Sequence, residues 1–462
     1  MKRNALIFIV FLGVVSFMGP LGLAQDSSIQ IVDVEGPGKK ASLRLTLKDC
    51  LQMALANNAK LAAKDYNIEA SEWRYKESQM RFMPILEYTN RSAPVPRDAA
   101  NAAESFFSGD VTYMNATKVG VGFPVYGFGQ LDKVQEIAIK GIEGAKMEKA
   151  KDEVKLVSDI KQLYYAILLS GDLAGLTQEA VHKIDTQLRT EEKDHVHSPY
   201  EVLRIRVFKS DLEKRLEEAK TRGALARRAL TLQMGLGDSE SFEMALTNLE
   251  PVTYDLKALD TYKSDAVDFR PESRLVDIGV EAKRLEYELE KKKLLPRLGV
   301  GGFFEIARTA TDVSNVNTSD EFLNPFNYTR AGVGMELKGT IDFHAARSRI
   351  RRLDSEYQKA SIERSLAKQG MELEVEEAYG EVLRLKGNMM HAEEKQKLAR
   401  QMMFLSKSNL DIGVGQEQEY TDSLQLVLLT EGEYLKSVFE YNVSIAKLEE
   451  KLGRRNHATT IQ

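Results

Sequence analysis

Four segments of the chain alternate apolar residues with small or charged ones, position by position, which is the pattern of β-strands. The predicted strands are 85–92, 117–126, 297–307 and 330–339. In the third, one side is apolar apart from one glycine: Leu298, Val300, Gly302, Phe304 and Ile306. The other side holds Arg297, Gly299, Gly301, Phe303, Glu305 and Ala307. The segments 94–110 and 309–328 between the strands are long and polar, and they predict surface loops.

Most of the remaining chain has the period of α-helices. The stretches 128–195 and 343–411 hold 68 and 69 residues without a proline, which predicts helices of about 100 Å each at about 1.5 Å per residue. The last helix repeats a seam at spacings of four and three, which is typical of a coiled coil with one acidic interruption: Tyr420, Leu424, Val427, Glu431, Tyr434, Val438, Tyr441, Ile445, Leu448 and Leu452. The first half has a looser stripe: Val202, Ile205, Phe208, Leu212, Leu216 and Ala219. We interpret both as packing surfaces.

The two halves of the chain repeat one another. Pro84 and Pro296 each end a helix before a strand and lie 212 residues apart, and Val119 and Ala331 in the following strands have the same offset. The later matches are Tyr164 with Tyr379, 215 apart, and Gly237 with Gly453, 216 apart. Such ordered anchors predict a duplicated unit of helix, strand, strand, long helix and helix.

An apolar strand face opposite a small or charged face is typical of a membrane barrel wall with lipid on one side and water on the other. Runs of about ten residues also have the length that a tilted membrane strand needs. The alternative is a soluble β-hairpin packed on helices. Four strands cannot close a barrel, and an open edge in lipid leaves unpaired backbone groups. The sequence therefore predicts a barrel shared between chains.

Composition and motifs argue against several classes of function. The chain of 462 residues is 43% hydrophobic and 29% charged, which is globular composition with a large core. With 64 Lys+Arg against 69 Asp+Glu it lacks the basic footprint of a nucleic-acid-binding protein. It contains no GxSxG, HExxH or GxxxxGK[ST] pattern, so we expect neither an enzyme nor a cofactor. His195 and His197 have no further ligands nearby in sequence, and we expect no metal site.

The N-terminus has the features of an export signal. Two basic residues precede the apolar run 5–17, and Gly-Leu-Ala at 22–24 fits a signal peptidase, which predicts cleavage after Ala24. A membrane anchor is the alternative, but the run is shorter than the roughly 20 residues of a spanning helix. No later stretch is apolar enough to span, so a membrane crossing must use strands. Cys50, the only cysteine, lies too far from the cleavage site to carry a lipoprotein's acyl chain.

In the order of these segments the chain resembles TolC-type outer-membrane efflux factors. The segment 45–61, LTLKDCLQMALANNAKL, is similar to the family's opening helix, and we expect Asn57 and Asn58 to supply a left-handed cap. The segment 269–275, FRPESRL, resembles the start of the second repeat, with Pro271 in a first helical turn. The resemblance implies a mainly α fold with a small membrane β-barrel contribution. Three chains would form one outer-membrane barrel of about 12 strands above a long coiled-coil tunnel in the periplasm.

The resemblance also implies partners and sites. The partners are two further copies in a homotrimer, outer-membrane lipid, a periplasmic adaptor (membrane fusion protein) and an inner-membrane pump. In that family the turns between long helices meet the adaptor, and the residues at those positions are Val196, His197, Ser198, Pro199, Gly413, Val414 and Gly415. Acids after the second turn line the closed entrance in the family, and Glu419 and Asp422 match them as a periplasmic gate.

Local alternatives exist at both turns. Ser198 and Glu201 form a capping-box pattern with Pro199 at the first helical position, which needs no role beyond helix initiation. Glu419 and Asp422 also suit a helix N-terminus, where the dipole favours acids. The first turn lacks the family's glycine, and Gly415 stands where the family has an arginine, which leaves the gate-locking contacts open.

The predicted organisation follows the duplication. Its parts are a signal peptide (1–24), an N-terminal segment with the first helix (25–84), two strands with an outer loop (85–126), a long helix, tip turn and return helix (127–237), an equatorial connector (238–268), the second first helix (269–296), two strands with a loop (297–341), the second long helix, turn and return helix (342–453) and a disordered tail (454–462). We predict an exit duct of a tripartite efflux or type I secretion system. The alternative is a periplasmic coiled-coil adaptor or structural protein of an envelope-spanning complex, but an adaptor would have one hairpin rather than a duplicated unit.

Overall fold

The computed structural model describes residues 43–194, 199–237, 242–316, 324–339 and 342–454. The predicted signal peptide and most of the predicted tail lie outside these ranges. None of the helices within them is long and apolar enough to cross a membrane.

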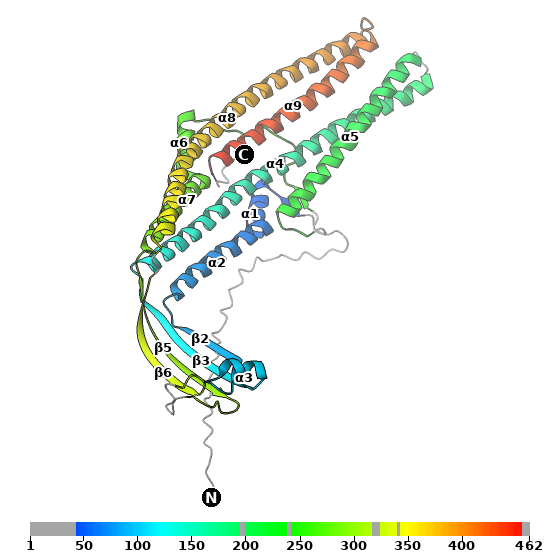
Figure 1. Ribbon diagram of the computed structural model, residues 1–462. Coiled ribbons are helices and arrows are strands. Elements are labelled where there is room, and N and C mark those ends of the chain that lie inside the picture. The colour runs from blue at the N-terminus through cyan, green and yellow to red at the C-terminus, as the bar shows by residue number, and fades with distance from the viewer. Residues whose placement is uncertain (1–42, 195–198, 238–241, 317–323, 340–341, 455–462) are drawn as a thin grey trace, which may run out of the picture. The chain divides into compact units, whose positions relative to one another are not determined.

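Four long strands form one antiparallel sheet, visible below the helices in Figure 1. Their order is β2 (Ile85–Pro96), β3 (Val111–Tyr126), β5 (Arg297–Thr309) and β6 (Tyr328–Lys338). All four predicted strands are present, and each extends further into its connecting loop than expected. The first connection also contains a helix where a loop was predicted, α3 (Ala102–Ser108), which ends at Gly109 with φ 77°. Its start is shaped by the Asp98 carboxylate, which accepts the N–H groups of Ala100 and Asn101.

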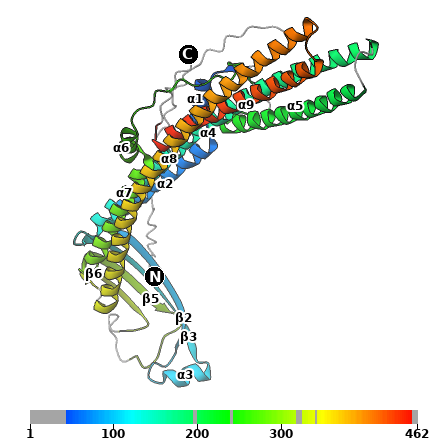
Figure 2. The same cartoon turned by 90° about the horizontal axis from the view of Figure 1, so that it is seen from above.

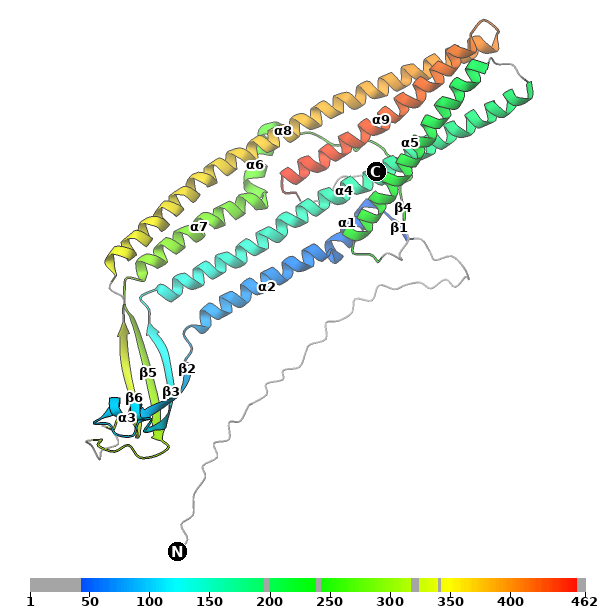
Figure 3. The same ribbon diagram turned by 45° about the vertical axis from the view of Figure 1, so that its right-hand side comes forward.

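Four helices continue the same order as the strands. They are α2 (Ala59–Met80), α4 (Gln130–Asp194), α7 (Pro271–Lys292) and α8 (Phe343–Asp411), and Figure 3 shows them side by side. Each joins its own strand: α2 precedes β2, α4 follows β3, α7 precedes β5 and α8 follows β6. The helices at the two edges of the helix layer, α2 and α8, are therefore connected to the strands at the two edges of the sheet, β2 and β6.

Two return helices turn the long helices into hairpins. α5 (Pro199–Gln233) packs along α4, α9 (Glu417–Lys451) packs along α8, and α9 also packs on α4, so the hairpins run together in Figure 2. Pro199 is the first residue of α5, as expected. The second tip turn, between α8 and α9, lies at the end of its hairpin that points away from the sheet (Figure 1).

The predicted left-handed cap at the first helix is wrong. α1 (Leu47–Asn57) ends where α2 begins, so Asn58 has φ −66° and ψ 120°, the extended conformation that an N-cap requires. Its side-chain oxygen accepts from the N–H groups of Lys60 and Leu61. The left-handed residue lies elsewhere: Gly235, after α5, has φ 70° and packs so closely on Asn57 that an added Cβ would lie 2.5 Å from the Asn57 carbonyl oxygen.

The second repeat closes in the same way. α6 (Leu259–Phe269) leads into α7, whose first residue is Pro271, as predicted. Gly453, after α9, has φ 67°, and a Cβ there would lie 2.7 Å from the Cα of Arg270. In each repeat a glycine after the return helix therefore packs against the junction of two helices. The shared device supports the duplication inferred from sequence.

The main core lies where the hairpins meet α1 and the connector. Its fully buried members include Cys50, Tyr164, Leu230, Val382 and Leu448, and burial raises the pKa of the Cys50 thiol to about 12. β1 (Leu43–Leu45) pairs in parallel with β4 (Phe242–Met244) beside it.

The connector then crosses α4 and α9. The Asp172 carboxylate accepts the Leu249 N–H at 2.7 Å, and the Asn442 side-chain oxygen accepts the Val252 N–H at 2.9 Å. These two bonds tie the link between the repeats to a helix from each.

Candidate functional site

The two faces of the sheet have opposite chemistry. On the outward face, cross-strand rows read Leu86, Val121, Gly302 and Val333, then Tyr88, Val119, Phe304 and Ala331, then Phe123, Val300 and Met335. Nothing in the described part of the chain covers this face, and Val333 is 92% exposed. The alternation predicted from sequence is therefore present as a continuous apolar surface.

The inner face carries glycine and charge instead. Its residues include Gly120, Gly122, Gly299, Gly301, Gly332 and Gly334. At Gly301 an added Cβ would lie 2.8 Å from the Val121 carbonyl oxygen, so the neighbouring strand lies too close for a side chain at this point. The same face also carries charged residues: Glu87, Arg91, Lys118, Arg297, Glu305, Arg330, Glu336 and Lys338. An apolar face backed by a polar face is what a membrane wall with an aqueous interior requires.

Both edges of this sheet are open. Among the described strands, β2 pairs only with β3, and β6 pairs only with β5. The edges present 12 and 11 residues of backbone. Unpaired strands of this length offer a template for pairing with another chain.

The second tip turn is tightly built around its glycines. Gly413 has φ 79°, and the Asn409 carbonyl accepts the N–H groups of Val414 and Gly415. A Cβ at Gly415 would lie 2.8 Å from the backbone nitrogen of Leu410, which explains why no arginine fits there without a change of the turn. Ile412 and Val414 are 72% and 79% exposed, so the turn ends in apolar side chains.

The first tip turn lies largely outside the described residues. Val196, His197 and Ser198, all predicted adaptor contacts, are among the residues not described, as is the predicted capping interaction of Ser198. Pro199 is described, and it is exposed at the start of α5.

The two predicted gate acids have different surroundings. Both lie in the first turns of α9, three residues apart, and Glu419 is exposed. Asp422 forms an ion pair with Arg204 of α5, and both side chains are only partly exposed. This pair joins the two hairpins near their tips. The sequence pattern did not point to Arg204, because its partner is 218 residues away.

The coiled-coil stripes are packing surfaces, as interpreted from sequence. Val427, Val438 and Leu448 of the α9 seam are buried, and so are Ile205 and Leu212 of the α5 stripe. The acidic interruption at Glu431 is satisfied by Arg400 of α8, whose Nη2 donates to its carboxylate at 2.6 Å.

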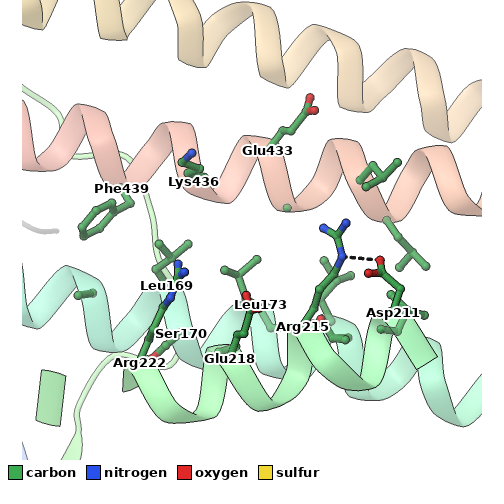
Figure 4. A pocket seen from close by; sticks show the side chains of 18 of the residues that line it. Leu169, Ser170, Leu173, Asp211, Arg215, Glu218, Arg222, Glu433, Lys436 and Phe439 are labelled. Atoms are coloured by element: carbon green, nitrogen blue, oxygen red, sulfur yellow. Dashed lines mark hydrogen bonds and ion pairs between the residues drawn. The ribbon is translucent and has the colours of Figure 1, made fainter. Parts of the chain in front are cut away.

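A groove of ≈ 550 Å³ runs between α4, α5 and α9, and Figure 4 shows it from close by. Leucines of α4, including Leu169 and Leu173, form its floor. Its rims are charged on both sides, with Asp211, Arg215, Glu218 and Arg222 on α5 and Glu433, Lys436 and Glu440 on α9. The rim residues recur at spacings of four and three on each helix, the periodicity with which coiled-coil helices pack.

Part of the chain matches a known family model. Residues 50–237 match the family model described as outer membrane efflux protein. A comparison with curated protein sequences gives no match.

Solved structures share the fold along most of the chain. A membrane protein from Pseudomonas aeruginosa matches with a TM-score of 0.72 and 15% identity, over 88% of this chain and 93% of that chain. The CmeC outer-membrane channel of Campylobacter jejuni matches with a TM-score of 0.70 and 15% identity, over 88% and 85%. The open state of the MtrE outer-membrane channel of Neisseria gonorrhoeae matches with a TM-score of 0.71 and 14% identity, over 88% of each chain. The family model therefore matches the first repeat, and the solved structures share the fold across both repeats.

Proposed function

We propose that three copies of the chain form a passive export duct, from the periplasm to the exterior, as the outer-membrane component of a tripartite efflux or type I secretion system. The sheet is the observation that carries this proposal. Its outward face is exposed and apolar, its inner face is glycine-rich and charged, and both of its edges are open.

Closure between copies follows from the strand order. Because four antiparallel strands lie in one sheet, β2 and β6 run in opposite directions, and β6 of one copy can pair antiparallel with β2 of the next. Three copies would supply about 12 strands, and closure removes every edge from the lipid. Pairing of these edges would satisfy the backbone groups that one chain leaves open.

The edges of the helix layer support the same assembly. On α2, Tyr66, Trp73 and Met80 are exposed and seven residues apart, which places them on one face. On α8, Ile362 and Leu366 form a comparable exposed apolar stripe. Since α2 adjoins β2 and α8 adjoins β6, sheet closure would bring these two stripes together and cover both.

The tips would meet the rest of the export machinery. The exposed apolar side chains of Ile412 and Val414, held by the glycine turn, form a contact surface for a periplasmic adaptor that links the duct to an inner-membrane pump. The groove between α4, α5 and α9, with its coiled-coil spacing, would accept a further helix of that adaptor.

The entrance would be lined by Glu419, with Asp422 in a supporting role. Three exposed copies of Glu419 near the axis would favour cations, as acid rings do. Asp422 is instead paired with Arg204. That ion pair would hold the α4–α5 and α8–α9 hairpins together and keep the entrance narrow.

The proposal is tested by the oligomeric state in detergent. Purified mature protein should behave in multi-angle light scattering as a trimer, and the outer-membrane fraction should contain a species that shifts on gels after heating. A periplasmic adaptor would instead fractionate without a heat-modifiable form. A monodisperse monomer in several detergents would contradict the shared barrel.

A further inference from the structure

The inner face of the sheet carries an excess of cations at one level. Two adjacent cross-strand rows lie there: Thr89, Lys118, Glu305 and Arg330, and then Arg91, Ala116, Ala307 and Tyr328. Successive residues on one face of a strand are about 7 Å apart, so the two rows form one band. We call Arg91, Lys118, Glu305 and Arg330 the basic belt. It holds three cations and one acid.

Two cations of the basic belt lie against aromatic rings, and the Arg330 guanidinium also donates to the Asn324 carbonyl at 3.4 Å. The Arg330 guanidinium lies 4.0 Å from the centre of the Tyr328 ring, and the Lys118 ammonium lies 5.4 Å from the centre of the Phe303 ring. The one acid, Glu305, accepts the Tyr328 hydroxyl at 2.8 Å. Within the described ranges, neither Arg91 nor Lys118 has an ion-pair partner, and both side chains are exposed.

The surroundings leave the basic belt accessible from the inner side. The next row reads Glu87, Gly120, Phe303 and Gly332, so glycines replace two side chains that could screen the charges. The Phe303 ring lies against Gly332, where an added Cβ would be 2.9 Å from the ring. One acid, Glu87, a flat ring and two glycines border the belt.

We propose that the basic belt is an anion-binding ring on the inner wall, which favours the exit of solutes that carry phosphate or carboxylate groups. This inference rests on the proposed trimeric duct, because only closure brings three belts around one lumen. Rings of Arg and Lys favour anions in pores. The belt is therefore expected to act opposite in sign to the acidic entrance and at the other end of the duct.

The test is a set of planar-bilayer recordings with the purified full-length trimer. The chloride-to-potassium permeability ratio is measured for the parent, for the double variant Arg91→Gln with Lys118→Gln, and for Glu305→Gln. The double variant should lower the ratio by about threefold or more, and Glu305→Gln, which keeps an acceptor for Tyr328, should raise it. Block by inorganic pyrophosphate added on the barrel side should weaken in the double variant.

Arg308→Gln is the matched control. Arg308 lies on the same strand as Glu305 but on the opposite face, where it donates to the Ala307 and Tyr328 carbonyls. A Gln amide can still donate there, and the permeability ratio should not change. The effect of the belt should also fade between about 0.01 M and 1 M salt, as the Debye length falls from about 30 Å to 3 Å.

The possible outcomes distinguish the anion-binding ring from the trimeric duct on which it rests. Channels that form normally but keep the parental permeability ratio in both belt variants would overturn the anion-binding ring alone. Failure of the parent to form trimers or channels would overturn the duct and the ring together. A ratio that falls equally with Arg308→Gln would show a general loss of charge and also overturn the ring.

Discussion

A charge introduced on the outward face of the sheet gives the sharpest test of the proposed barrel wall. Val333 is the sixth of the 11 residues of β6 and is 92% exposed on the outward face. Five residues on either side, at about 3.4 Å each and a tilt of about 40°, put it roughly 13 Å from both ends of the strand. In the proposed barrel it would therefore lie near the middle of an apolar band about 25 Å tall.

At that depth Val333→Arg should cost about 2–4 kcal/mol per chain, because an arginine at the midplane must leave water. Three copies in one barrel would lose roughly 6–12 kcal/mol, enough to prevent assembly of most of the protein. The control is Gly334→Arg, one residue further along β6. Its side chain faces the inner side, and a Cβ there meets no atom within 4 Å.

The assay compares both variants with the parent in the outer-membrane fraction, as the yield of heat-modifiable trimer, and then in detergent, as the midpoint of chemical denaturation. Val333→Arg should lose most of the trimer, and Gly334→Arg should keep most of it. Equal losses in the two variants would show that the assignment of the lipid and water faces is wrong.

Three other tests address the junctions, the entrance and the connector. Gly235→Ala should lower the free energy of unfolding by about 1 kcal/mol or more, because its φ is 70° and the Asn57 carbonyl blocks a Cβ. In the control Gly237→Ala, the added Cβ meets no atom within 4 Å, so the free energy of unfolding should change little. Denaturation followed by circular dichroism compares the two variants. Glu419→Gln should lower cation preference in bilayer recordings, whereas Asp422→Asn, which breaks the pair with Arg204, should raise conductance; identical effects would contradict their separate roles. Burial raises the pKa of the Asp172 carboxyl, so the native state loses stability as the pH rises through that pKa. The gain in thermal stability of Asp172→Asn over the parent should therefore be larger near pH 7 than near pH 4. An equal gain at the two pH values would refute this prediction.

Much of the fold was predictable because it depends on local periodicity. Alternation along four segments predicted the strands and their two faces, and the heptad spacing in α5 and α9 predicted which residues are buried. The duplication was visible as offsets of 212 to 216 between matching residues. The glycine that packs like Gly453 is Gly235, however, rather than the Gly237 matched from sequence. Proline at the first position of α5 and of α7 also follows from local sterics. Apart from the repeat offset, each of these signals resides in neighbouring residues.

The remaining features required the tertiary structure. Asn58 was assigned the wrong conformation because its role depends on how α1 meets α2, and the left-handed glycine that packs there is Gly235, far along the chain. Helix α3 was missed because its start depends on the Asp98 carboxylate, which also accepts from Asn315 of the other connection.

The candidate sites divide in the same way. The sequence by itself placed Glu419 and Asp422 after the second tip turn, but only packing of the two hairpins brings Arg204 to Asp422. Likewise, charges on four separate strands become one basic belt only through strand register, which fixes Lys118 beside Glu305 and Glu305 beside Arg330. Periodicity in the sequence predicts which face of an element a side chain lies on. The partners of that side chain depend on which distant segments pack against that face in the fold.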